Sequence, residues 1–308
     1  SYEMTNEPSL TIERHEHGYD YRPAGVGGYE PSAVTAWHAW LEARHGGLAQ
    51  LNRRWRTAYD KFSDIAPPPD LRPPSPENGV VPVGTGPLYD FQTFRAQSHA
   101  AWFRHCIEAF RRGDPHKAVI SQFVSPPVER KDAAVDLRIL AEEVPWSIYG
   151  THDWPGDRPA VESLYAVCMN RRAQRPHWED EFIWSQWERK GTPEPIMRAA
   201  LERNLWRQIA WGKRGISLFN LESEWAHDSP RNWNNSLLNL EADSEIPRYC
   251  TGVLPTIERK ANGFKDLLYA TELGPADVAI LRPTTATLVA APDGLVRRFD
   301  DHLRGLGK

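Results

Sequence analysis

The pattern of apolar and polar residues predicts helices and short strands that alternate along most of the chain. Trp37, Trp40 and Leu41 recur at helical spacing on one face, and the glycine pair at 46 and 47 ends that helix. Further helices are predicted over residues 48–55, 87–112, 137–143, 160–172 and 195–211. Short strands are predicted before Glu7 and over residues 118–123, 146–149, 178–181 and 215–219.

Two stretches do not follow either periodicity. Residues 15–28 are rich in His, Gly and Tyr, and we expect a polar loop there. Residues 66–86 are rich in Pro and Gly and are predicted to be irregular. The helix predicted next, over residues 87–112, should present an apolar face made of Phe91, Phe94, Trp102, Phe103, Cys106 and Phe110.

The alternation of strands and helices predicts an α/β fold in which crossover helices connect the strands of a parallel sheet. Two architectures have this pattern, a (β/α)8 barrel and a doubly wound open sheet. The sequence contains no GxGxxG and no Walker loop. Nucleotide binding, which many doubly wound sheets support, is therefore disfavoured.

Composition narrows the class of partner. The chain has 308 residues and a formal net charge of -4, with acidic and basic residues interspersed. No basic stripe points to nucleic acid, and no apolar run is long enough to cross a membrane. The 13 Trp have two interpretations, bulky core residues or flat platforms for sugar rings, and composition does not separate them.

Cysteine and histidine usage bears on metals and on the compartment. Cys106, Cys168 and Cys250 are far apart and form no CxxC, so we expect buried free thiols in a reducing, cytoplasmic setting. His15 and His17 are spaced as metal ligands can be, but such a pair more often lines a cleft. We expect no metal and no cofactor.

Polar residues gather at or just after the predicted strands. Glu7 follows the first strand, Gln122 lies in the second, His152 follows the third and Glu181 ends the fourth. In a (β/α)8 barrel these points lie on one face, the carboxyl-terminal mouth where active sites occur. Two carboxylates from two strand ends are the groups that glycoside hydrolysis requires, and Glu7 and Glu181 are the candidates.

The segment Tyr29-Glu-Pro-Ser32, with Trp37, Trp40-Leu41 and Gly46-Gly-Leu-Ala-Gln-Leu-Asn52, resembles a helix-turn-helix of the family 42 β-galactosidases. These are retaining glycosidases with (β/α)8 catalytic domains. Further segments resemble the family's later strands in the same order: Val119 to Phe123, Trp154-Pro155, Pro176 to Glu181 and Gly215 to Asn220. The likeness extends over roughly residues 1 to 290.

The resemblance implies roles for individual residues. Glu7, after Asn6, would be the acid/base, Glu181 the nucleophile, and Asn6 a partner of the sugar 2-hydroxyl. The remaining residues expected to contact the carbohydrate are Gln122, His152, Trp154, Trp184, Trp225 and His227. The family's metal-binding cysteines are not recognisable.

The resemblance also implies an arrangement of domains. The chain would begin in strand four of a TIM barrel and supply strands four to eight, with residues 1–272 in the barrel and 273–308 forming a linker or the beginning of a following α/β domain. A five-stranded arc cannot close, so a second polypeptide is expected to supply the first three strands in a hetero-oligomer.

Two departures from the family pattern bear on function. Glu179, Asp180 and Glu181 form an acidic run, and strict alternation would put Glu179 on the same side as Glu181, deeper in the barrel. The segment after the last strand, residues 220–225, departs from the family's usual ending, which bears on sugar specificity. Two alternatives therefore stay open: a non-catalytic subunit or pseudoenzyme that keeps the fold, and a glycosidase of the same clan acting on another sugar.

Overall fold

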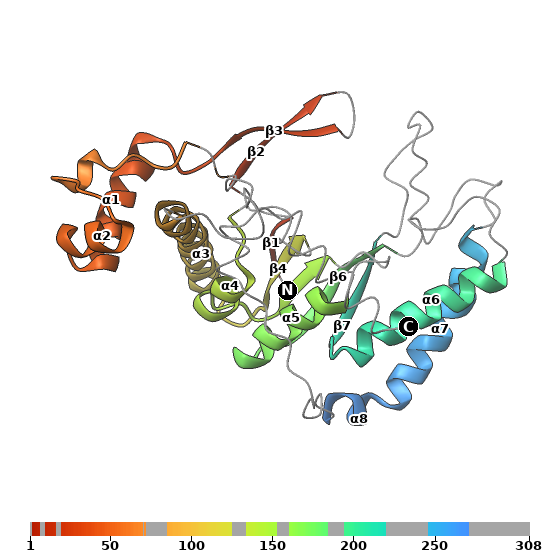
Figure 1. The fold of residues 1–308 in the computed structure, drawn as a ribbon. Coiled ribbons are helices and arrows are strands. Elements are labelled where there is room, and N and C mark those ends of the chain that lie inside the picture. Colours follow the sequence, from red (N-terminus) through yellow and green to blue (C-terminus); the bar gives the residue numbers. More distant parts are fainter. Residues whose placement is uncertain are drawn as a thin grey trace. The chain divides into compact units, whose positions relative to one another are not determined.

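The computed structural model describes residues 2–6, 10–16, 20–69, 71, 85–124, 134–152, 160–183, 194–219 and 246–270. The chain forms two compact units (Figure 1). The first comprises Ser1–Glu7, Lys117–Ser125 and Trp146–Val278, and the second comprises Pro8–His116, Pro126–Pro145 and Ala279–Lys308.

A parallel sheet of five strands forms the centre of the first unit. Its strands are β1 (Tyr2–Asn6), β4 (Val119–Val124), β5 (Tyr149–His152), β6 (His177–Ile183) and β7 (Gly215–Phe219). They lie side by side in the order of the chain, β1-β4-β5-β6-β7. A doubly wound sheet reverses its strand order at a switch point, and this sheet has no reversal among the described strands. Successive right-handed crossovers in one direction place all connections on one face, as in a barrel.

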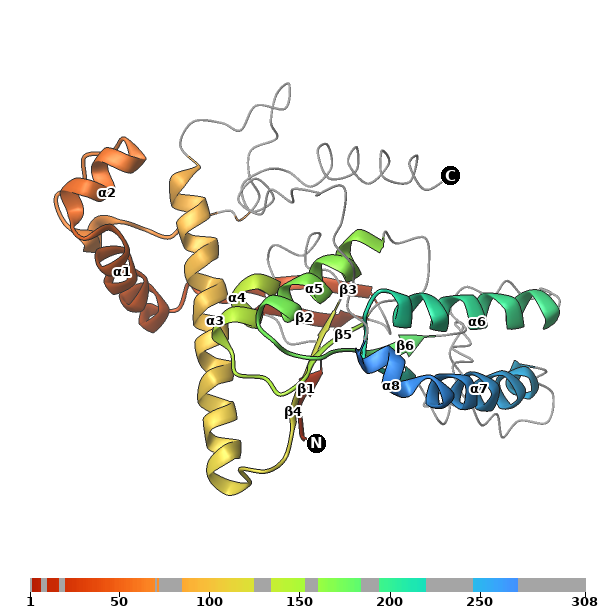
Figure 2. The ribbon, with the colours of Figure 1, turned by 90° about the horizontal axis from the view of Figure 1, so that it is seen from below.

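In the described part of the chain, four helices belong to the first unit. They are α5 (Ala160–Arg172), α6 (Glu194–Ala210), α7 (Ile246–Gly263) and α8 (Lys265–Ala270). The first two confirm the predicted crossover helices. Helices α6 and α7 run side by side, and α6 also packs on β7 (Figure 2). Helices α7 and α8 were not predicted, because Pro255 interrupts the pattern inside α7.

An antiparallel hairpin in the second unit replaces the loop that we expected after Glu7. Strand β2 (Thr11–Glu16) pairs with β3 (Asp20–Val26), so the prediction of a polar loop over residues 15–28 was wrong. The many His, Gly and Tyr residues suggested a loop. However, two facing segments of six and seven residues satisfy each other's backbone groups whatever their composition.

The other described elements of the second unit are helical, and they form a core of their own. Its helices are α1 (Pro31–His45), α2 (Leu48–Trp55), the 3-10 turn η1 (Phe62–Asp64), α3 (Gly86–Gly113) and α4 (Leu137–Glu143). All but η1 confirm predicted helices. Trp37 is fully buried and stacks on Trp55, with ring centroids 6.3 Å apart. Phe91 of α3 meets the Trp37 ring edge-on, so aromatic packing joins α1, α2 and α3.

A buried carboxylate links these three helices. Asp90 of α3 accepts hydrogen bonds from Arg44 Nε at 2.7 Å and from Trp55 Nε1 at 2.9 Å. His45 Nε2 lies 2.9 Å from the same carboxylate. A buried charge is stable only when its hydrogen-bonding capacity is filled, and three donors do so here.

The carboxyl-terminal half of α3 differs from the predicted apolar face. Phe91, Phe94 and Phe103 are buried, as expected. Trp102 is 50 % exposed and Phe110 is 36 % exposed, so these two do not contribute to a core in the described part of the chain. Strict helical spacing holds along the sequence, but the described elements cover only part of that face.

His99 of α3 generates a prediction about pH. Burial lowers the pKa of His99 from 6.5 to about 4, the bond from its ring to the Ala134 carbonyl opposes that change, and Arg95 adds to it. The folded state therefore binds fewer protons than the unfolded state between those values. The free energy of unfolding should fall by roughly 3 kcal/mol from this group as the pH drops from about 6.5 to about 4.

The substitution His99→Asn keeps a donor near the Ala134 carbonyl but removes the titration. Urea unfolding of both proteins across this pH range should show a flatter dependence in the variant. Equal slopes in the two proteins would contradict the assignment of this pH dependence to His99.

Candidate active site

The carboxyl-terminal ends of the five parallel strands lie on one edge of the sheet. Asn6, the last residue of β1, is level with Gln122 of β4, and His152 of β5 is level with Val124. His152 is the last residue of β5 and not, as expected, a residue after the strand. Glu7 lies outside the described residues, as do the side chains of Asn6, Gln122 and Glu181. The backbone of Glu181 lies in β6, near the same edge.

Strand β6 contains a β-bulge at the residues that carry the acidic run. Glu179 is level with Ile216 of β7, whereas Phe182 is level with Leu218. Three steps along β6 therefore match two steps along β7, so β6 has one extra residue between Glu179 and Phe182. Bulges occur often beside active sites, where they change the direction of a side chain.

Strand β1 has the same irregularity just before Glu7. Glu3 is level with Ile120 and Asn6 is level with Gln122, so β1 also has one extra residue. Strand β1, which ends one residue before Glu7 in the sequence, and strand β6, which contains Glu181, therefore each have a bulge close to their carboxyl-terminal end.

The bulge overturns the expected placement of Glu179. Residues level with each other in neighbouring strands share a face, so Glu179 shares the face of Ile216. Ile216 lines a pocket with Leu205 and Ile209 of α6, which identifies this face as the one toward the helices. Glu179 therefore faces the helices rather than the interior of a barrel. The expectation was wrong because it assumed unbroken alternation along β6.

The carboxylate of Glu179 is paired on that face. Its Oε2 accepts a hydrogen bond from Lys213 Nζ at 2.5 Å, and both side chains are fully buried. Lys213 precedes β7, after a turn in which Gly212 has a φ of 91°. The burial of this lysine was not predicted, because a charged residue beside a glycine is typical of a solvated surface turn.

The opposite face of the sheet carries a second buried polar pair. His152 Nε2 of β5 lies 3.5 Å from Asp180 Oδ1 of β6, and the two side chains are 0 % and 4 % exposed. Gly150 makes room for this pair, because a Cβ there would collide with the Asp180 carboxylate and with the Ser121 carbonyl. The Asp180 side chain therefore extends over β5 and occupies the space that a side chain at position 150 would fill.

A second glycine has the same role one strand further on. A Cβ at Gly215 would collide with the ring of Trp178, which is level with Gly215 in the pairing of β6 with β7. The inner side chains of β6 thus lean over glycines on both neighbouring strands.

The two interpretations of the tryptophans are resolved for part of the set. Trp37, Trp55 and Trp146 are at most 6 % exposed and belong to cores. The candidate sugar platforms Trp154, Trp184 and Trp225, together with His227, lie outside the described residues.

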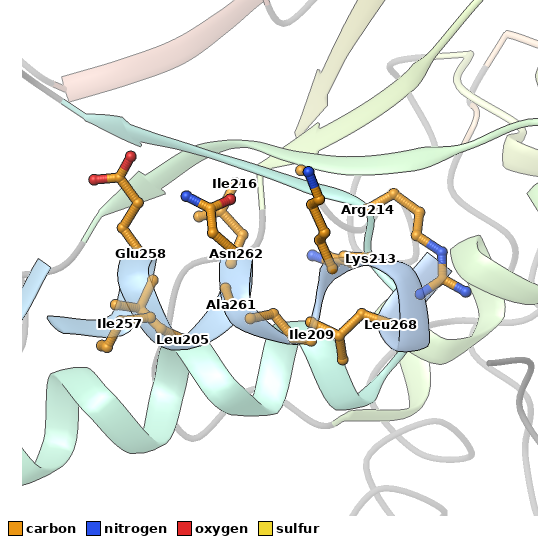
Figure 3. Close-up of a pocket in the computed structure, with 12 residues that line it drawn as sticks. Leu205, Ile209, Lys213, Arg214, Ile216, Ile257, Glu258, Ala261, Asn262 and Leu268 are labelled. Atoms are coloured by element: carbon orange, nitrogen blue, oxygen red, sulfur yellow. The ribbon is translucent and has the colours of Figure 1, made fainter. Parts of the chain in front are cut away.

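A pocket of about 470 Å³ lies between α6, α7, α8 and the start of β7 (Figure 3). Its walls are mostly apolar, with Lys213 and Arg214 above them. It is at the amino-terminal end of β7, whereas the backbone of Glu181 lies near the carboxyl-terminal edge of the sheet. We therefore do not assign the pocket to the candidate active site.

The described residues offer little support for other kinds of site. No group of three or more metal-ligating side chains occurs among them. Cys106 is partly exposed and Cys168 exposed, so the expectation of buried thiols was wrong for both, although both are free. No helix in the described part of the chain is long and apolar enough to span a membrane.

Comparison with known proteins identifies relatives of this architecture. The model of glycoside hydrolase family 42, described as beta-galactosidase, matches residues 18–229. That match includes Gln122, His152 and Glu181 but begins after Asn6 and Glu7. No curated protein matches the chain.

Solved structures are similar at low sequence identity. A β-galactosidase from the psychrophilic Marinomonas ef1 has a TM-score of 0.56 at 15% identity, over 79% of this chain and 39% of that one. A cold-adapted β-galactosidase from Rahnella sp. R3 has a TM-score of 0.55 at 14% identity, over 86% and 41%. The chain thus spans about two fifths of the length of these relatives, and the likeness supports a TIM-barrel type of α/β fold.

The buried pair of Glu179 and Lys213 generates a prediction about stability. Lys213→Met leaves a buried carboxylate without its cation, and the free energy of unfolding should fall by about 3–5 kcal/mol. Adding Glu179→Leu removes the buried carboxylate and should restore most of the lost free energy of unfolding. Urea unfolding of the three proteins measures both effects, and equal instability of the single and double variants would contradict the charge explanation.

Proposed function

The chain belongs to glycoside hydrolase family 42, the β-galactosidase family, and from this premise we propose that it carries the catalytic carboxylates of a retaining glycosidase acting on terminal β-galactosides or related β-glycosides. The observation that best supports the proposal is the position of Glu181, at the bulged carboxyl-terminal part of β6. Glu7 follows β1, whose end lies on the same edge of the parallel sheet.

The reaction proceeds by two displacements. In the first, the Glu181 carboxylate attacks the anomeric carbon, the glycosidic bond breaks, and the Glu7 carboxyl gives its proton to the leaving oxygen. In the second, Glu7 takes a proton from water, whose oxygen attacks the same carbon and releases Glu181. Each step inverts the anomeric centre, so the overall result is retention.

The surrounding residues bind the sugar in this proposal. Asn6 donates a hydrogen bond to the 2-hydroxyl, and this bond strengthens in the transition state. Gln122, level with Asn6 on the neighbouring strand, adds a second polar group at the same height. Trp154, Trp184 and Trp225 present flat apolar faces to the ring, and His227 adds to the polar lining. The side chain of His152, which was also expected to contact the sugar, is fully buried and lies 3.5 Å from Asp180.

A second polypeptide completes the barrel in this proposal. In the described sheet, β1 and β7 each pair with one neighbour only, so each leaves one edge without a strand. An exposed parallel edge pairs readily with further strands, and a barrel closes only when every edge is paired. We assign strands four to eight of the barrel to β1, β4, β5, β6 and β7, and strands one to three to the partner.

The remaining expectations about location and domains enter here as proposals too. The free thiols of Cys106 and Cys168 support a reducing, cytoplasmic compartment. The proposed boundary between residues 272 and 273 and the expected domain beyond it lie outside the described residues.

A non-catalytic subunit is the second candidate function. The two open edges of the described sheet favour it, because a half-barrel can serve assembly alone. The presence of a candidate carboxylate at each of two bulged strands, Glu7 after β1 and Glu181 in β6, argues against a non-catalytic subunit.

The assembly proposal predicts the native mass of the purified particle. We expect a mass well above one chain, with a second and different polypeptide present, because both edges of the sheet need strands. Native mass spectrometry measures this directly. A particle made only of copies of this chain would contradict the hetero-oligomer.

The catalytic proposal predicts covalent labelling of Glu181. An activated 2-deoxy-2-fluoro-β-galactoside slows both displacements, but its good leaving group keeps the first one faster, so a glycosyl-enzyme accumulates. Peptide mass spectrometry should find the adduct on the peptide containing Glu181. Glu181→Ala should lose both labelling and aryl galactosidase activity, by a factor of 10⁴ or more, on the order of other nucleophile removals.

Glu179→Gln is the matched control for this experiment. It removes a carboxylate two residues away on the helix-facing side but keeps a polar partner for Lys213, so the adduct should still form on the Glu181 peptide in the folded fraction, although more slowly than in wild type. An adduct on Glu179 or Asp180 would overturn the assignment of the nucleophile. Activity that survives in Glu181→Ala would overturn the proposed mechanism.

A further inference from the structure

We propose that His152 and Lys213 are positioning residues that hold the β6 bulge from its two faces and so fix the direction of the Glu181 carboxylate. The inference rests on the proposed function, because it takes Glu181 as the nucleophile. Neither residue is placed in contact with the reacting atoms, and each acts through an acidic neighbour of Glu181.

The residue before the bulge is fixed on the helix-facing side. Glu179 is paired with Lys213, and both side chains have no exposed surface. Lys213 lies two residues before β7, the strand with which β6 pairs. The ion pair therefore connects the start of the bulge to the residues just before β7. The backbone pairing of Glu179 with Ile216 is a second connection between the two strands.

The next residue is fixed on the opposite side. Asp180 meets His152 of β5 at 3.5 Å, and the glycine at 150 leaves the space that its carboxylate occupies. Consecutive acidic residues thus have buried partners on opposite faces and on opposite neighbouring strands. Phe182, after the bulge, is fully buried and returns to the face of Glu179.

These anchors matter because a bulge has a competing arrangement. If β6 slipped by one residue, the extra residue would disappear and every later side chain would move to the other face. If instead the residues up to Asp180 shifted to remove the bulge, Glu179 would separate from Lys213 and Asp180 from His152. Fixing a register is the best-attested use of buried polar pairs, and here the register decides where Glu181 lies.

The test compares His152→Ala, His152→Gln and wild type in the assembled particle. Alanine removes the imidazole that lies 3.5 Å from Asp180, whereas glutamine places a polar nitrogen near the position of Nε2. We expect kcat for an aryl β-galactoside to fall by about 10- to 100-fold in His152→Ala with little change in KM, because binding groups stay while the nucleophile is misplaced. His152→Gln should recover most of the lost kcat.

Hydrogen exchange supplies a readout that does not depend on activity. The backbone amides of residues 177–183 should exchange about tenfold faster or more in His152→Ala, because the bulge opens locally. The matched control is His45→Ala, which breaks another buried histidine–carboxylate pair, His45 with Asp90 in the second unit. That variant should speed exchange in α1 and α3 but change neither β6 nor kcat.

The outcomes separate this inference from the proposed function. If Glu181→Ala is inactive while folded His152→Ala keeps wild-type kcat and exchange over residues 177–183, the positioning role is overturned. If KM rises and kcat is unchanged in His152→Ala, His152 contacts the sugar and the positioning role is also overturned. If the wild-type particle hydrolyses no aryl glycoside, the proposed function fails, and the exchange result still decides whether His152 holds the bulge.

Discussion

The register between β6 and its two neighbours is the constraint on which the candidate site depends. In a parallel sheet, residues at the same level share a face, so the pairings of β6 with β5 and β7 decide which acidic side chain faces the helices. One extra residue between Glu179 and Phe182 divides the acidic run between the two faces. The role proposed for Glu181 therefore depends first on the β6 bulge, which is a feature of the backbone.

The surrounding sequence is consistent with that irregularity. Gly150 and Gly215 lie where Asp180 and Trp178 lean over the neighbouring strands, and a larger residue at either position would collide with them. Buried ionisable groups are costly unless paired, and Glu179 meets Lys213 while Asp180 meets His152. In this family 42 chain, packing and charged pairs together hold the acidic run in place.

Sequence patterns predicted the order of the elements well, because each helix or strand carries its own periodicity. The predicted last strand, residues 215–219, matches β7, and the long predicted helix matches α3 within one residue at each end. The hairpin of β2 and β3 was missed because its strands are stabilised by each other and not by a local apolar pattern. The bulge was missed for a related reason: register is a property of two strands, and alternation along β6 alone does not contain it. Lys213 was missed because burial of a charge is decided by its partner, which is 34 residues away in the chain.

The central claim is that two carboxylates at one edge of the sheet act by double displacement, which needs them about 5–5.5 Å apart. The most direct measurement is the anomeric configuration of the sugar first released from an aryl β-galactoside, followed by ¹H NMR before mutarotation. The account predicts that the β-anomer appears first. Initial release of the α-anomer would mean inversion, with the carboxylates roughly 6.5–9.5 Å apart and a water between them, and would contradict the role given to Glu181.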